Sequence, residues 1–329
     1  MKSWQEVLAE LMGDFRVYAP FRNEITLDYQ FISKETIPSI IYNTPIPVTP
    51  LKMFFLPVKE NVTREVDASE KNVIIGVPSC DLHALDILDE IYLNEPFIDS
   101  FYEQRRKNTF LIGTDCFSIL PHCHCTTYGI TAYPAKNHDI GLAVLNEEVF
   151  LTIKTSKGNE FFEQYIRKAN PEKIEQDENQ KILEIREKIK EVLTNQNIHL
   201  PDYASTGFLI QESDDSIWQK YSKTCVSCGA CATICPTCTC FLLVDRPGFE
   251  KIRQLDACQY PGFAKTAAGE DQLKKRFVRF RNRYLCKYVW KPEKFTSIAC
   301  TGCGRCIDTC IGNISKNELF IELKNGLII

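Results

Sequence analysis

The chain has 329 residues, 44% of them hydrophobic, and a formal net charge of −4. This length is sufficient for two domains with an apolar core. The slightly acidic balance argues against general nucleic-acid binding, and no apolar stretch approaches the roughly 20 residues that a membrane span needs.

The N-terminal half is predicted to form an α+β (or α/β) domain. An amphipathic helix is expected over 1–13, where charged residues interrupt the apolar ones and exclude a signal peptide. Short apolar strands are predicted at 53–58, 73–77, 109–113 and 149–153, and helices at 82–92 and 98–106.

The middle of the chain, from 168 to 195, is rich in Glu, Lys, Gln and Ile at helical spacing. This pattern predicts a solvated helix or helical pair. A further helix is expected at 214–221. We therefore divide the chain into an N-terminal α/β domain at 1–165, a charged helical linker at 166–200 and a ferredoxin-like domain at 201–329 with an insertion at 236–299.

Cysteine accounts for 16 residues, and eight of them follow two copies of one spacing. The copies are Cys225-x2-Cys228-x2-Cys231-x3-Cys235-Pro236 and Cys300-x2-Cys303-x2-Cys306-x3-Cys310. This is the spacing of bacterial two-cluster ferredoxins, in which three thiolates bind one [4Fe-4S] cluster and the fourth binds its neighbour. Pro236 suits the first position of a helix after Cys235, whereas Ile311 follows Cys310.

If the fourth cysteine of each run binds the cluster of the other run, the eight cysteines form two sets of four ligands. The first ferredoxin quartet is Cys225, Cys228, Cys231 and Cys310, and the second ferredoxin quartet is Cys235, Cys300, Cys303 and Cys306. Two zinc knuckles would leave the third and fourth cysteines of each run without a role. The radical S-adenosylmethionine spacing at Cys231, Cys235 and Cys238 overlaps the longer run, and no barrel pattern follows it, so we interpret it as coincidence.

Four more cysteines lie in the N-terminal domain and form the N-terminal quartet: Cys80, Cys116, Cys123 and Cys125. Cys80 and Cys116 each follow a predicted strand, so two parallel strands would bring both thiols to one end of a sheet. A third [4Fe-4S] cluster is the favoured interpretation. A zinc or mixed Cys/His site beside His83, His122 and His124 is an alternative, as are buried free thiols.

The insertion holds the last four cysteines, the insertion quartet: Cys238, Cys240, Cys258 and Cys286. Cys238 and Cys240 must lie near the ferredoxin clusters, and the other two would have to fold back to meet them. A fourth cluster is the favoured interpretation here. The basic stretch from 274 to 287 either raises cluster potentials, within a range of about −700 to +450 mV, or forms an ordinary solvated face.

Several strings occur in order along the chain: GVPSCDLHAL at 76–85, Cys116 with the loop 123–125, CVSCGAC at 225–231, CPTCTCF at 235–241, DAC at 256–258, RFR at 279–281 and CTGCGRC at 300–306. In this set the chain resembles the iron-sulfur beta subunits of soluble sulfhydrogenases and the A subunit of anaerobic sulfite reductases. One departure concerns the fourth site: where the family has a His-Lys pair, this chain has Cys286-Lys287.

The resemblance implies a subunit that relays electrons between a flavoprotein subunit, which oxidises NAD(P)H or reduced ferredoxin, and a catalytic hydrogenase or reductase subunit. Consistent with this, the sequence has no dinucleotide fingerprint, no P-loop and no haem motif. Two other functions stay open: an enzyme whose N-terminal cluster binds substrate, and a metal-stabilised scaffold or redox sensor. A cytoplasmic location, with reduced and metal-bound thiols, is expected.

Overall fold

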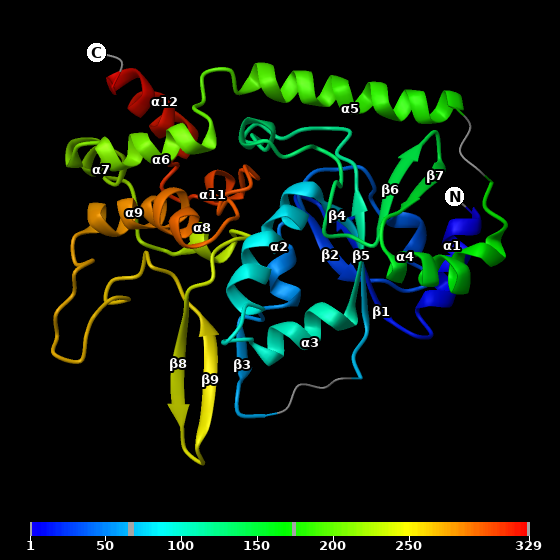
Figure 1. Cartoon of the computed structure of the whole chain (residues 1–329), viewed down its shortest axis with the longest axis horizontal. Helices are drawn as coiled ribbons and strands as arrows, with labels where there is room; N and C mark the ends of the chain where they lie inside the picture. The colour runs from blue at the N-terminus through cyan, green and yellow to red at the C-terminus, as the bar shows by residue number, and fades with distance from the viewer. Residues whose placement is uncertain (1, 65–68, 173–175, 328–329) are drawn as a thin grey trace.

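We describe a computed structural model of the chain, which covers residues 2–64, 69–172 and 176–327. A six-stranded sheet organises the N-terminal half, in the order β2-β1-β4-β5-β6-β7 (Figure 1). Its strands are β1 (Arg16–Arg22), β2 (Leu27–Phe31), β4 (Asn72–Pro78), β5 (Thr109–Thr114), β6 (Ile140–Leu145) and β7 (Glu148–Ile153). The four inner strands run parallel, and the two edge strands pair antiparallel to their neighbours.

Helices cover both faces of this sheet, which explains why β4 is a nearly continuous apolar run. Val73 and Ile75 pack toward α1, whereas Ile74 and Val77 pack toward α2. The helices of this half are α1 (Lys2–Leu11), α2 (Ser79–Tyr92), α3 (Ser100–Asn108) and α4 (Ser156–Phe161). Because both faces are buried, the sheet is a rigid support for the loops at its edges.

Most predicted elements of this half are confirmed. Strands occur at 73–77, 109–113 and 149–153, and the expected helices at 1–13, 82–92 and 98–106 correspond to α1, α2 and α3. Met1 lies outside the described residues.

The prediction of a strand at 53–58 is wrong. The chain forms a 3-10 helix, η2 (Leu51–Phe54), and then the short strand β3 (Lys59–Asn61). Leu51, Phe55 and Leu56 are all buried, so the apolar residues follow a helical turn and not the alternation of a half-buried strand.

The charged segment in the middle of the chain forms one long helix, α5 (Gln176–Gln196), in the part that the structure describes. Residues 173–175 of the predicted segment lie outside that part. Figure 1 shows α5 running from the N-terminal sheet to the C-terminal helices. Its Ile189 and Leu193 side chains are buried, and Arg186 forms an ion pair with Asp115 at 2.6 Å, so α5 is anchored along one face.

The C-terminal half packs helices around Trp218, Phe280, Tyr284 and Phe320. These helices are α6 (Tyr203–Glu212), α7 (Asp215–Tyr221), α8 (Ala230–Thr233), α9 (Arg276–Leu285), α10 (Lys291–Lys294), α11 (Arg305–Asp308) and α12 (Lys316–Leu327). The helix expected at 214–221 is confirmed as α7. Short 3-10 or π turns occupy η1 (Ile37–Ser39), η3 (Thr126–Tyr128), η4 (Phe162–Ile166), η5 (Arg167–Ala169) and η6 (Cys286–Trp290).

A hairpin of β8 (Phe241–Arg246) and β9 (Glu250–Leu255) projects from the body of the molecule (Figure 1). Strand β3, from the N-terminal half, pairs antiparallel with β9. Arg253 of β9 also forms ion pairs with Glu60 and Asp99. The insertion is therefore joined to the N-terminal half by strand pairing and by buried charges.

No helix in the described parts of the chain is long and apolar enough to cross a bilayer.

Candidate iron-sulfur centres

The two ferredoxin-type runs fold in the same way. In each, a glycine in the left-handed conformation, Gly229 (φ +72°) or Gly304 (φ +80°), precedes a helix of four residues, α8 or α11. A side chain at Gly229 would lie 2.6 Å from the ring of Tyr260, so both conformation and space require glycine. The repeated spacing in the sequence thus produces a repeated local structure.

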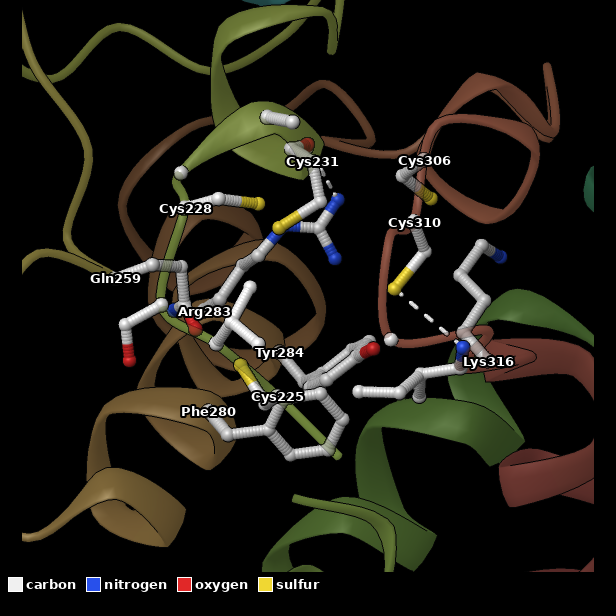
Figure 2. A pocket seen from close by; sticks show the side chains of 16 residues that line it. Cys225, Cys228, Cys231, Gln259, Phe280, Arg283, Tyr284, Cys306, Cys310 and Lys316 are labelled. Carbon is white, nitrogen blue, oxygen red and sulfur yellow. Dashed lines mark hydrogen bonds between the residues drawn. The ribbon is translucent and has the colours of Figure 1, made fainter. Parts of the chain in front are cut away.

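The first ferredoxin quartet comes together around one cavity. Its lining includes all four cysteines of the quartet, and Cys306 of the second quartet also contributes. Figure 2 shows Cys225, Cys228 and Cys231, from the loop and helix at 225–233, facing Cys306 and Cys310 across the cavity. The fourth cysteine of one run therefore lies with the first three of the other, as the crossed arrangement requires.

The second ferredoxin quartet is more deeply buried. Burial raises the pKa of Cys303, and the nearby Cys235 and Cys306 thiols raise it further. The hydroxyl of Thr237 donates to the carbonyl of Ala299 at 2.6 Å. This bond joins the segment after Cys235 to the segment before Cys300.

The N-terminal quartet also meets, at the sheet edge where the predicted strands end. Strands β4 and β5 are parallel; Cys80 lies in the first turn of α2, directly after β4, and Cys116 lies two residues after β5. All four cysteines line a second cavity. Burial raises the pKa of Cys125 to about 12, with a further contribution from the Cys123 thiol.

Cys303 also lines the cavity of the N-terminal quartet, so this quartet adjoins the second ferredoxin quartet. The backbones around them are in close contact: a side chain on Gly302 would lie 2.6 Å from the nitrogen of Cys125, and the amide of His124 donates to the carbonyl of Gly302 at 2.9 Å. Gly302 (φ +67°) is thus required by conformation and by contact.

The cysteines of the insertion quartet also lie close together. A thiol hydrogen bond between Cys240 and Cys258 raises the pKa of Cys240 and lowers that of Cys258. The Cys238 and Cys286 thiols contribute to the same upward shift at Cys240. Cys238 in turn hydrogen-bonds Cys235, so the insertion quartet adjoins the second ferredoxin quartet.

Buried cations surround these quartets. Lys52 donates to the carbonyls of Ala232 (3.3 Å) and Cys238 (3.0 Å), and Arg283 donates to the carbonyl of Cys231 (3.0 Å). Lys287 donates to the Thr237 hydroxyl at 2.7 Å. Burial alone would lower the pKa of Lys287, but the neighbouring thiols, Cys235 first, raise it well above its usual value.

Lys52, Arg283 and Lys287 are each at most 4% exposed, yet no carboxylate of the described residues forms an ion pair with them. Burial lowers the pKa of Lys52, and an uncompensated buried charge is costly, so the charged forms of these three groups require an anion that the protein atoms do not supply. The Nε atom of Arg283 also has no hydrogen-bond partner among the described atoms. Thiolate-ligated iron-sulfur clusters are anionic, and they fit this donor set and this charge.

In the described part of the chain, no three His, Cys, Asp or Glu side chains converge closely enough to hold a single metal ion.

Some residues near these centres were not predicted from the sequence. Lys52 directly precedes the segment that was predicted as a strand (53–58), and it lies outside the bounds of that prediction. Arg305, between two ferredoxin cysteines, forms an ion pair with Asp81. Lys316 lies 2.7 Å from the Nε2 atom of His124, and no sequence pattern connects these two residues.

Comparisons with known proteins agree with this architecture. Residues 224–314 match the family model of the 4Fe-4S dicluster domain, which defines the C-terminal part as an iron-sulfur protein of that class. The whole chain is 31% identical over 328 residues to the sulfhydrogenase 2 subunit beta of Pyrococcus furiosus, with 95% of this chain and 93% of that protein aligned. The chain therefore belongs to the family of iron-sulfur beta subunits of sulfhydrogenases. No solved structure matches it.

Proposed function

We propose that the chain is the electron-relay subunit of a multi-subunit oxidoreductase. The observation that carries this proposal is the contact of the second ferredoxin quartet with all three others: Cys303 lines the N-terminal cavity, Cys306 lines the first ferredoxin cavity, and the Cys235 and Cys238 thiols form a hydrogen bond. Contacts of this kind would let electrons pass between clusters held by neighbouring quartets.

Each quartet would hold one [4Fe-4S] cluster, which when bound accepts and donates one electron at a time. The protein supplies the thiolates and their orientation. The buried cations Lys52, Arg283 and Lys287 balance the negative charge, and so favour the more reduced state. The Ser79 and Thr301 hydroxyls, buried next to Cys80 and Cys300 with no partner among the described atoms, are free to donate to sulfur.

The partners that we propose are a flavoprotein subunit that takes electrons from NAD(P)H or ferredoxin, and a catalytic subunit of hydrogenase or sulfite/sulfur reductase type. Two observations support this: the relative named above is a sulfhydrogenase subunit, and no dinucleotide fingerprint occurs in this sequence. A reducing compartment such as the cytoplasm would keep the sixteen thiols available for iron.

The relay can be separated from its two alternatives by one pair of measurements on the reconstituted chain. Stepwise reduction with mediators, followed by absorption, should be reversible, and an assay with an artificial electron donor should give no turnover of protons, sulfite or polysulfide. Turnover by the isolated chain would instead support an enzyme with a substrate-binding N-terminal cluster. Clusters that cannot be reduced reversibly would support a scaffold.

A further inference from the structure

The first ferredoxin quartet reaches the molecular surface at Cys228. Cys228 is the one exposed residue among the sixteen cysteines, all of which the structure describes. Apolar side chains are also exposed near it: Val226 at 63%, Ile311 at 71% and Tyr260 at 38%. We call Val226, Cys228, Tyr260 and Ile311 the Cys228 patch.

Two contacts bring together the segments that carry the patch. Tyr260 lies against Gly229, directly after Cys228, since a side chain there would be 2.6 Å from the tyrosine ring. On the other side, the Thr224 hydroxyl donates to the carbonyl of Gly312 at 2.8 Å, which places Ile311 beside the start of the cysteine loop. Three distant segments thus present apolar groups around one exposed ligand.

A basic group lies next to the patch. Lys274, Lys275 and Arg276 are exposed at the N-terminal end of α9, and Arg276 Nη1 lies 3.5 Å from the carbonyl oxygen of Cys225. Cations are unfavourable at a helix N-terminus, and the first turn of α9 has no acidic residue. These three positive charges therefore do not stabilise α9. They form a local basic region on a chain whose net charge is −4.

From this arrangement we infer that a neighbouring redox subunit docks on the Cys228 patch and presents acidic residues to Lys274, Lys275 and Arg276. The inference rests on the proposed relay function. An apolar centre with a charged rim is the usual anatomy of a specific interface, in which rim charges set orientation and association rate. One electron crosses the interface, so that one subunit is oxidised by one electron and the other reduced, and no bond forms or breaks.

The test uses the complex purified without oxygen from native cells. Carbodiimide joins lysines to carboxylates in direct contact, and mass spectrometry maps the products. We expect products that link Lys274 or Lys275 to Asp or Glu of a subunit with its own redox cofactor. Links from these lysines only within the chain, links to a subunit without a redox cofactor, or a chain that purifies without any partner would each overturn the inference.

Matched variants test the two parts of the surface separately. Lys274→Glu with Lys275→Glu should weaken partner binding about tenfold or more, measured by partner retained across a salt series, while α9 is kept because anions suit its N-terminus. The control pair, Lys181→Glu with Lys188→Glu on the exposed face of α5, should bind normally. Equal loss in both pairs would contradict a specific basic rim.

For the apolar part, Ile311→Asp should release the partner, whereas Ile198→Asp, at a similarly exposed isoleucine (66%), should not. Iron content and reversible reduction are measured on every variant. If the unmodified chain holds no reducible iron, the relay function itself fails. If the clusters are intact and the partner is unaffected by Ile311→Asp, only the docking inference fails.

Discussion

The guanidinium of Arg305 and the carboxylate of Asp81 form a buried two-point ion pair, with Nη1–Oδ1 and Nη2–Oδ2 distances of 2.5 and 2.9 Å. Arg305 lies between Cys303 and Cys306, and Asp81 follows Cys80, so the pair joins the loops of two quartets. Arg305 also donates to the carbonyl of Pro47. Together with the bond from the His124 amide to the Gly302 carbonyl, this pair holds the ferredoxin-type loop against the N-terminal half.

Replacement of one member of this pair should be strongly destabilising. Arg305→Leu leaves the carboxylate of Asp81 buried without its partner, and the expected loss in the free energy of unfolding is about 3–5 kcal/mol. Chemical denaturation of the iron-loaded protein measures it. The control Arg167→Leu breaks an exposed pair with Glu163, and its effect should be much smaller than that of Arg305→Leu. Similar effects for both variants would contradict the structural role of the buried pair.

Removal of a buried cation should lower cluster potentials. A charge about 7 Å away, at an effective dielectric constant of about 20, contributes roughly 2 kcal/mol, or on the order of 100 mV for one electron. Lys287→Met should therefore shift a midpoint potential downward by on the order of 50–100 mV, because the reduced state carries more negative charge. Redox titration followed by electron paramagnetic resonance measures the shift. Lys190→Met, at an exposed lysine on α5, should leave the potentials unchanged.

The pattern of predicted and missed features has physical causes. The two ferredoxin runs and strands β4 and β5 were predictable because their signals are local: a fixed cysteine spacing and a continuous apolar run. The segment around Lys52 was not, because its buried lysine is explained only by cysteines almost two hundred residues later. The pairing of β3 with β9 likewise joins two segments that no local pattern relates.

The surroundings of the cysteines likewise include features that were predictable from the sequence and features that were not. Parallel pairing of β4 and β5 brings Cys80 and Cys116 to one edge, as the sequence predicted. The charges around the quartets were predicted only in part. The sequence shows one basic stretch from 274 to 287, but the side chains of this stretch differ in burial. Arg283 and Lys287 are buried beside the cysteines, whereas Lys274 and Lys275 are exposed. Only the fold separates the two groups.

Buried His138 should make stability depend on pH. Burial lowers its pKa, its Nδ1 lies 3.0 Å from the carbonyl of Lys136, and its buried Nε2 has no partner among the described atoms. The unfolded chain, with a histidine pKa of about 6.5, therefore binds more protons near that pH, and stability falls as the pH drops below it. Denaturation at pH 8 and pH 6 should show a smaller loss for His138→Gln than for the unmodified protein. An equal loss would contradict a neutral buried His138.

Iron content tests the four quartets separately. If every quartet is loaded, the chain binds about 16 irons, four for each cluster. Cys286→Ser should remove or degrade one cluster, Cys125→Ser should affect a different one, and the ferredoxin pair should survive both. A content near 8 would mean that the two outer quartets are free thiols. A content near 12 that falls with Cys125→Ser but not with Cys286→Ser would leave the insertion quartet without a cluster.

The most direct measurement is electron paramagnetic resonance, with metal analysis, on the chain isolated without oxygen and then reduced. The two ferredoxin quartets lie side by side, because Cys306 of one lines the cavity of the other. We expect iron, and magnetically interacting [4Fe-4S] signals after reduction. Zinc in place of iron, or isolated and non-interacting signals, would contradict it.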